Sequence, residues 1–406
     1  MEYKEYKLSE LSKDNKGTYG IGASAVEYSK DLYTYLRITD IKEDGSLDYK
    51  NLKSVDDKNA EKYLLKKGDI VFARTGNSTG KAYYYDGEIQ NLVYAGFLIK
   101  FSLDENKVNP KFMKYYTMTK EYKNWVKEIQ TGSTRGNINE KMYGNMKVRL
   151  PSRIYQDKMV ALLEGIDRKV ELNVQINNNL LEISQNLYEN YINTNKNIIY
   201  KKIRELNPIL ESGKRPNGGV SNIKEGIPSV GAENVKELGY YDYSKTKYVT
   251  EEFFNKMKKG ILKGYEVLIY KDGGKPGYFI PNFSIFGENF PFTKCAINEH
   301  VFLLDFNDIK YNCFAYYYFN SFKIRHQLHV LGSKSAAIPG INQQDVLDLE
   351  IPYSESEEFK NLSNILKLNT QKILKNSYQN RTLEQLRDIL LPKLMNGEID
   401  LDKIEF

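Results

Sequence analysis

Two residue types that often carry chemistry are scarce in this chain of 406 residues. It has only two cysteines, Cys295 and Cys313, and three histidines. Two cysteines cannot build a disulfide framework, and their scarcity indicates a reducing compartment. No cluster of cysteines or carboxylates accompanies the histidines in sequence, so we expect no zinc or other metal site.

Long apolar runs are missing as well. No stretch approaches the roughly 18 apolar residues that a membrane-spanning helix needs, and residues 1–13 are charged and lack the apolar core of a signal peptide. We therefore expect a cytoplasmic protein with no membrane partner. The net charge of +6 is compatible with a polyanionic partner but does not require one.

Proline is absent for about forty residues after Pro151, and Ser152 can cap a helix there. Apolar residues then recur at alternating steps of three and four, which is typical of a coiled coil. A helix of forty residues spans roughly 60 Å and cannot bury such a seam alone. The predicted seam of this helix is Met159, Leu162, Ile166, Asn173, Ile176, Leu180, Ile183 and Leu187.

A second helix with the same design follows Pro352 and is expected to stop at Pro392. Two dipeptides support an internal repeat of about 200 residues, since Leu150-Pro151 recurs as Ile351-Pro352 and Leu181-Glu182 as Leu383-Glu384. Asn173 and Asn369 would fix the register of the helix pair at some cost in stability, unless both are simply solvated. The predicted seam of the second helix is Leu362, Leu366, Asn369, Ile373, Leu383 and Leu390.

The repeat predicts an α+β fold in which two β-rich domains are separated by two long antiparallel helices. The second helix must run back along the first if the two seams are to meet. The expected segments are a first domain at 1–150, a first spacer helix at 151–195, a second domain at 196–351, and a second helix with the C-terminal tail at 352–406.

Glycine-rich polar loops stand at matching places in the two domains, at 74–81 and 271–277. The first resembles a nucleotide phosphate loop but fails on spacing, because four residues separate Gly76 from Lys81 and no Ser or Thr follows the lysine. We find no catalytic constellation in the sequence. The loops are therefore either ordinary surface turns, or places where amides, Arg and Lys face DNA.

The architecture and several local motifs together resemble the specificity subunit of Type I restriction–modification systems. The resemblance covers nearly the whole chain. Its motifs are Pro151-Ser152-x-x-x-Gln156, Ile166-Asp167-x-Lys169-x-Glu171-x-Asn173, and a tail at 390–399 that reads Leu-Leu-Pro-Lys-Leu-Met-Asn-Gly-Glu-Ile. The second helix departs from the pattern, with Asn369-Thr370-Gln371 where Asp167-Arg168-Lys169 stands in the first.

The resemblance implies two target recognition domains, each reading half of a split double-stranded DNA sequence. The helices would dock two modification subunits that use S-adenosylmethionine to methylate adenine, joined in restricting systems by two ATP- and Mg-dependent restriction subunits. The chain itself would hold no cofactor and perform no catalysis. Two other hypotheses are a nuclease or methyltransferase in its own right, and a coiled-coil interaction protein with RNA- or ligand-binding end domains.

The expected DNA contacts are loop residues with side chains that pair with bases or phosphates. In the first domain they are Arg37, Thr39, Arg74, Asn77, Ser78, Lys81, Arg135 and Asn137. In the second domain they are Lys214, Arg215, Asn217, Glu233, Asn234, Lys271, Lys275 and Lys334.

Overall fold

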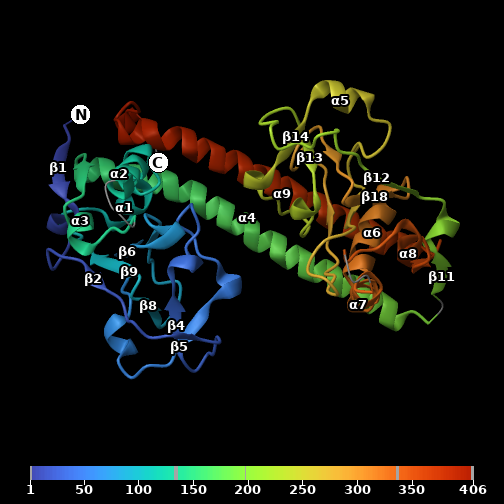
Figure 1. Ribbon diagram of the computed structural model, residues 1–406, viewed down its shortest axis with the longest axis horizontal. Helices are drawn as coiled ribbons and strands as arrows, with labels where there is room; N and C mark the ends of the chain where they lie inside the picture. Colours follow the sequence, from blue (N-terminus) through green and yellow to red (C-terminus); the bar gives the residue numbers. More distant parts are fainter. Residues whose placement is uncertain (1, 132–135, 197, 335–337, 404–406) are drawn as a thin grey trace. The chain divides into compact units, whose positions relative to one another are not determined.

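The computed structural model describes residues 2–131, 136–196, 198–334 and 338–403 (Figure 1). The chain divides into two compact units. The first contains residues 1–167 and 385–406, and the second contains residues 168–384. Each of the two long helices therefore contributes one part to each unit.

The first unit is built on short antiparallel sheets. A four-stranded sheet has the order β2 (Thr18–Tyr19), β9 (Leu98–Ser102), β6 (Asp69–Ala73) and β7 (Ala82–Tyr84). A second has the order β3 (Ala25–Val26), β5 (Lys53–Val55), β4 (Tyr33–Leu36) and β8 (Leu92–Tyr94), with β4 and β8 parallel. The remaining elements are the pair β1 (Lys4–Lys7) and β10 (Lys147–Leu150), and the helices α1 (Pro110–Tyr116), α2 (Lys120–Thr131) and α3 (Glu140–Gly144).

The central strand β6 is buried along its whole length. A strand covered on both faces reads as a continuous apolar run, and Ile-Val-Phe-Ala provides one here. Phe72 stacks on Tyr143 of α3, with ring centroids 4.8 Å apart, and lies edge-on to Phe101. The helices α2 and α3 therefore pack on the sheet through aromatic rings, which add an estimated 0.5–1.5 kcal/mol per pair beyond burial.

The second unit repeats this arrangement. Its four-stranded sheet has the order β12 (Ile209–Ser212), β18 (Val301–Asp305), β15 (Val267–Tyr270) and β16 (Phe283–Ile285). Its three-stranded sheet has the order β14 (Lys247–Val249), β13 (Ile227–Val230) and β17 (Ala296–Ile297), with β13 and β17 parallel. The remaining elements are the pair β11 (Ile199–Lys202) and β19 (Glu350–Tyr353), and the helices α5 (Glu251–Lys256), α6 (Ile309–Asn320), α7 (Phe322–Gly332) and α8 (Gln343–Leu347).

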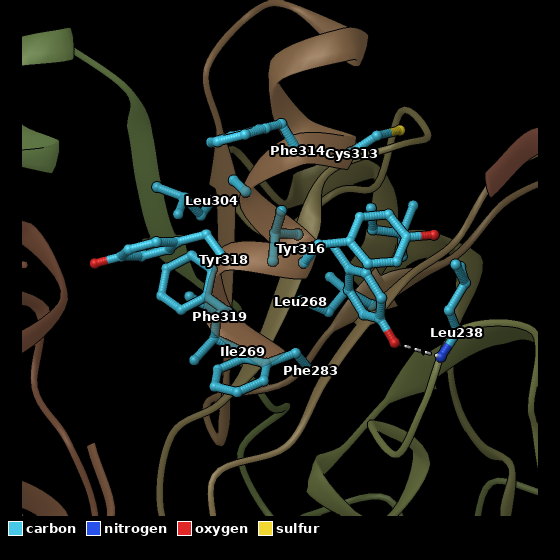
Figure 2. Close-up of a cluster of buried hydrophobic side chains, with 14 of the residues drawn as sticks. Leu238, Leu268, Ile269, Phe283, Leu304, Cys313, Phe314, Tyr316, Tyr318 and Phe319 are labelled. Carbon is cyan, nitrogen blue, oxygen red and sulfur yellow. Dashed lines mark hydrogen bonds between the residues drawn. The ribbon is translucent and has the colours of Figure 1, made fainter. Parts of the chain in front are cut away.

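Helix α6 forms the centre of the second unit's core. Figure 2 shows its side chains Phe314, Tyr318 and Phe319 among the leucines and isoleucines of β15 and β18. The N–H of Leu238 donates to the hydroxyl of the buried Tyr316 at 3.1 Å (Figure 2). A helix that is apolar on most sides must be enclosed, and the hydroxyls of Tyr311, Tyr316 and Tyr318 find partners within this core.

The two long helices are α4 (Arg153–Thr194), with 42 residues, and α9 (Glu357–Met395), with 39. The expected cap is present, since Ser152 Oγ accepts from Tyr155 N at 3.4 Å. Within the second unit the helices run antiparallel: Asn173 bonds to Asn380, Asn177 to Asn376, and Ser184 to Asn369. The predicted fold class, two β-rich domains with an antiparallel helix pair, is confirmed. None of the helices in the described ranges is both long and apolar enough to cross a membrane.

The contact between the helices in the second unit is polar at its centre. Asn173 Nδ2 donates to Asn380 Oδ1 at 2.8 Å, and Asn376 Nδ2 donates to Asn177 Oδ1 at 2.8 Å. Asn173 is only 1% exposed. A shift of 203 positions carries 173 onto 376 and 177 onto 380. The two pairs therefore exchange under the internal repeat, and each end of the network is a copy of the other.

The predicted seam of α4 is wrong at Ile176 and Ile183. Ile176 is 39% exposed and Ile183 is 51% exposed. The stripe that faces α9 and the domain core instead runs through Asn173, Asn177, Ser184, Tyr188 and Tyr191. The predicted seam followed the spacing of apolar residues alone. It therefore omitted the polar part of the helix contact, where Asn and Ser side chains are buried because they are hydrogen-bonded.

The other predicted seam residues lie in or beside the core. Buried in addition to Asn173 are Met159, Ile166, Leu362, Leu366 and Ile373. Partly buried are Leu162, Leu180, Leu187, Asn369, Leu383 and Leu390.

The expected stop at Pro392 is also wrong, because α9 continues through Pro392 to Met395. Proline removes one backbone donor without ending a helix when the next turn is held by other contacts. Leu391 and Leu394 are buried here. Tyr155 Oη also lies 3.1 Å from Leu394 O and 3.0 Å from Ile399 O, which fastens the end of α9 to α4 within the first unit.

A single carboxylate joins three helices of the first unit. Asp167 of α4 accepts from Lys114 Nζ at 2.7 Å, from the Tyr115 hydroxyl at 3.0 Å, and from Arg387 Nη1 of α9 at 3.0 Å. Burial alone would raise the pKa of Asp167, but the two cations outweigh it and hold that pKa below its usual value. The group is therefore ionised and paired.

We expect Asn177→Ala to destabilise the second unit by roughly 1–3 kcal/mol, because it leaves the buried amide of Asn376 without an acceptor. The measurement is denaturant unfolding of the full chain. Asn179→Ala is the matched control, since Asn179 lies on the same helix but is exposed, and its effect should stay within about 0.5 kcal/mol. Equal effects of the two substitutions would contradict the structural role of the network.

We expect Asp167→Asn to cost roughly 2–3 kcal/mol, because it leaves Arg387 poorly compensated. Asp388→Asn is the control; Asp388 also meets Arg387 but is exposed, and exposed pairs contribute about 0–1 kcal/mol. Since the pKa of Asp167 is lowered, its contribution is complete above about pH 4 and disappears as the pH falls through the folded-state pKa. The free energies of unfolding of the wild type and of Asp167→Asn should therefore converge as the pH is lowered. A constant difference would contradict this assignment.

Candidate nucleic-acid interface

The two glycine-rich loops are held by the same backbone hydrogen bonds. In the first unit, Arg74 N donates to Phe97 O and Ile138 N donates to Arg74 O, both at 3.0 Å. In the second unit, Lys271 N donates to His300 O at 3.0 Å and Ile341 N donates to Lys271 O at 2.8 Å. Lys271 therefore occupies the position of Arg74, and His300 that of Phe97.

A second pair of turns also matches. Arg37 N donates to Asp40 Oδ2 at 2.8 Å, and Gly231 N donates to Asn234 Oδ1 at 3.1 Å. Each bond closes a short 3-10 turn, at Ile38–Asp40 and at Ala232–Asn234. The scaffold is therefore repeated at these two places, while the side chains that it presents there differ.

The base of the first loop is fixed by tyrosines from the helices. The Tyr122 hydroxyl donates to Gly80 O at 2.7 Å and the Tyr143 hydroxyl to Ala73 O at 2.8 Å. Gly80 has φ of +89°, and a Cβ there would lie 2.4 Å from Val126 Cγ1. A glycine is required at this position both for its backbone conformation and for the close approach of α2.

In the first unit the structure brings two of the predicted residues together. The guanidinium carbon of Arg74 lies 4.9 Å from the ring centroid of Tyr19, and Asn137 Oδ1 accepts from Thr75 Oγ1 at 2.6 Å beside it. Thr39 and Asn77 are exposed. Arg135 lies outside the described residues. Tyr19 and Phe97 were not predicted, because no pattern in the sequence near Arg74 indicates that they lie beside it.

Several of the predicted DNA contacts already have partners inside the protein. Arg37 is bonded to Asp40 at 2.6 Å and to Asn51 O at 2.9 Å, and its bond to Asp40 raises its pKa. Lys81 Nζ lies 3.0 Å from Glu43 and donates to Ile41 O at 3.3 Å. Ser78 and Asn234 are buried. These side chains support the turns in this structure, and their expected contacts with DNA stay predictions.

The second unit has an open groove of 830 Å³ at the corresponding loop. Its lining includes the predicted residues Glu233 and Lys275, together with Asp272, Tyr278, His300 and Ile338. His300 Nδ1 lies 2.5 Å from Asp272 Oδ1. Tyr278 and Ile338 are exposed apolar surfaces. Asp272 and His300 are 28 residues apart, so only the fold could reveal their contact.

The groove is lined by carboxylates and by a lysine side chain that is exposed to solvent. Burial raises the pKa of Glu233, but hydrogen bonds from Lys247 and the backbone outweigh it, so that pKa is lowered and the group is an anion. Lys275 is exposed. Lys271 instead donates to Glu299 O at 3.2 Å, which occupies its ammonium group. The groove therefore offers both acceptors and a cation.

The remaining candidates of the second unit lie on the surface. Lys214, Asn217 and Lys334 are exposed, and Arg215 pairs with Glu299 at 3.1 Å. In the described part of the chain, no three His, Cys, Asp or Glu side chains gather in a way that could hold a metal ion.

Comparison with known proteins agrees with this arrangement. Residues 1–182 match the family described as the Type I restriction modification DNA specificity domain. The specificity subunit of the Type I restriction enzyme HindI of Haemophilus influenzae is 22% identical, over 83% of this chain and 88% of that protein. The chain is therefore similar to the specificity subunits of Type I restriction–modification systems, and its first 182 residues match their DNA specificity domain.

Two further comparisons give the same similarity. The specificity subunit of the MjaIX enzyme of Methanocaldococcus jannaschii is 21% identical to this chain, over 74% of this chain and 72% of that protein. The crystal structure of the S subunit from M. genitalium superposes with a TM-score of 0.58 at 14% identity, covering 97% of this chain and 96% of that one. The structural likeness shows a common fold.

If Lys275 contacts a DNA phosphate, we expect Lys275→Ala to weaken binding to all duplexes alike and to reduce the salt dependence of binding by roughly one unit. The measurement is DNA affinity at graded salt concentrations. Lys310→Ala is the control, because Lys310 is exposed at the start of α6, away from the groove lining, and should leave the salt dependence unchanged. A Lys275→Ala protein with altered base preference and an unchanged salt dependence would show a base contact instead.

Proposed function

We propose that this chain determines which DNA sequence a Type I restriction–modification complex binds, and that it performs no catalysis itself. Each unit would contact one part of a bipartite duplex target through its loops. Partner modification subunits would then methylate adenine in the bound site, and restriction subunits, where present, would cleave unmodified DNA.

The observation that carries this proposal is the repeated scaffold with different loop side chains. The backbone bonds of Arg74 and Lys271 are the same, yet an arginine on an aromatic ring stands in one unit and a lysine beside an Asp–His pair in the other. Contacts to phosphates position a protein on DNA, whereas side chains at base edges give specificity. Two copies of one scaffold with different side chains therefore support two different half-sites.

The helices offer surfaces for the partner subunits. Ile183 of α4 and Leu386 of α9 are equivalent under the repeat, and both are exposed, at 51% and 44%. Exposed apolar side chains that recur on a helix favour a protein contact. One modification subunit for each repeat gives two in the complex, and these would bring S-adenosylmethionine, while restriction subunits would bring ATP and magnesium. The DNA target and the free buried cysteines Cys295 and Cys313 support a cytoplasmic location.

The test is to map methylated adenines in a host without endogenous methylation that expresses the modification subunits with and without this chain. We expect one bipartite motif with the chain and none without it. Exchanging residues 271–277 for the loop of another specificity subunit should change one half of the motif and leave the other half intact. Methylation that is independent of the chain, or binding of RNA in place of duplex DNA, would overturn the proposal.

A further inference from the structure

Arg74 is the first residue after β6, and its backbone is fixed on both sides. Its N–H donates to Phe97 O and its carbonyl accepts from Ile138 N, each at 3.0 Å. The side chain therefore leaves the scaffold from a defined point, and its direction does not depend on the freedom of the glycine-rich loop that follows.

The guanidinium group lies against an aromatic ring and is not paired with a carboxylate among the described residues. It lies over the ring of Tyr19 at 4.9 Å from the ring centroid. That ring is itself oriented, because Glu140 N at the start of α3 donates to the Tyr19 hydroxyl at 3.1 Å. Arg74 Nε is buried and has no hydrogen-bond partner, and the described residues provide no carboxylate paired with this arginine. Arg37, by contrast, donates hydrogen bonds to the Asp40 carboxylate and to the Asn51 carbonyl.

The surroundings of Arg74 are open and suited to a flat ligand. Phe97 is 59% exposed beside it. Gly76 and Gly136 border the site, and a Cβ at either would meet nothing within 4 Å. Asn137 uses its Oδ1 to accept from Thr75, so its amide N–H₂ group faces away from that bond. The site presents donors of hydrogen bonds and aromatic faces.

We propose that Arg74 determines specificity in the first unit by reading a guanine, with Tyr19 as its positioning residue. The planar fork of an arginine pairs with guanine O6 and N7 in the major groove, and stacking on a ring limits the orientations of that fork. This assignment rests on the proposed function, since it names one base contact of the half-site that the first unit binds.

The second unit has no such fork at the equivalent place. Lys271 donates to Glu299 O at 3.2 Å and lies over the Phe302 ring at 5.4 Å, and the next residue, Asp272, is bonded to His300. Lys271 has one donor engaged by Glu299 and has no planar fork, so it lacks the fixed bidentate geometry that an arginine presents. The guanine contact therefore belongs to one half-site only.

The experiment selects duplexes from a randomised library with the complex of the full chain and its modification subunits, first for the wild type and then for Arg74→Lys and Arg74→Gln. The half-site of the first unit is the one that does not change when residues 271–277 are exchanged. We expect a guanine there whose preference over other bases falls roughly tenfold to hundredfold in both variants, as one bidentate pair predicts. Preferences in the other half-site should be unchanged.

Tyr19 provides an independent measurement. Tyr19→Ala should relax the same guanine position, whereas Tyr19→Phe, which keeps the ring, should retain most of the discrimination. A merely structural role would move stability and overall affinity but not the preference at one base. Arg149→Lys is the matched control, because Arg149 of β10 also lies over a tyrosine ring, that of Tyr3, at 5.2 Å from its centroid, and it should leave every base preference in place.

Other outcomes would overturn the assignment. Uniform weakening on all sequences with a smaller salt dependence would make Arg74 a phosphate contact. A changed preference in the other half-site would place Arg74 at the wrong end of the target. If the wild type selects no bipartite sequence, the proposed function itself fails, and this result is distinct from a motif that is insensitive to Arg74 and Tyr19.

Discussion

The buried amide network between α4 and α9 is the interaction on which the register of the second unit depends. Asn177 meets Asn376, and Asn173 meets Asn380. An amide removed from water must find its partner, whereas an apolar contact tolerates a shift along the helix. A slip of one helical turn would leave four buried amides without hydrogen-bond partners, so the network specifies one alignment of the helices. Leucines at these positions could add more stability, but they would not fix the alignment in this way.

The register in turn positions the domain that packs on the helices. Gly239 lies so close to α9 that a Cβ would be 2.6 Å from Ile373 Cγ2, and Ile373 belongs to the same turn that bonds Asn177. Tyr188 of α4 packs on Phe314 of α6 with ring centroids 5.2 Å apart. The sheet, helix α6 and the long helices of this unit therefore share one core, and the loops project from a rigid base.

The repeat separates what must be kept from what can vary. Backbone bonds at Arg74 and Lys271, and at Arg37 and Gly231, are alike in the two units. The side chains at those positions differ in charge and in partners. Function is thus carried by a few side chains on a common scaffold, and the useful distinction among them is whether their donors are already engaged. Arg37, Lys81 and Lys271 are engaged within the protein, while Arg74 and Lys275 are available to a partner.

The sequence by itself determined the repeat, the two long helices, their antiparallel pairing and the family resemblance, because these follow from periodicity and from short motifs that act locally. It could not determine which face of α4 is buried after Asn173, since a polar interface leaves no apolar pattern to read. It also missed the continuation of α9 past Pro392, which depends on Tyr155, distant in sequence. Which cations are free was decided only by the tertiary structure, because the partners of a charge, such as Asp167 for Arg387 or Glu299 for Lys271, are brought to it by the fold and not by the chain.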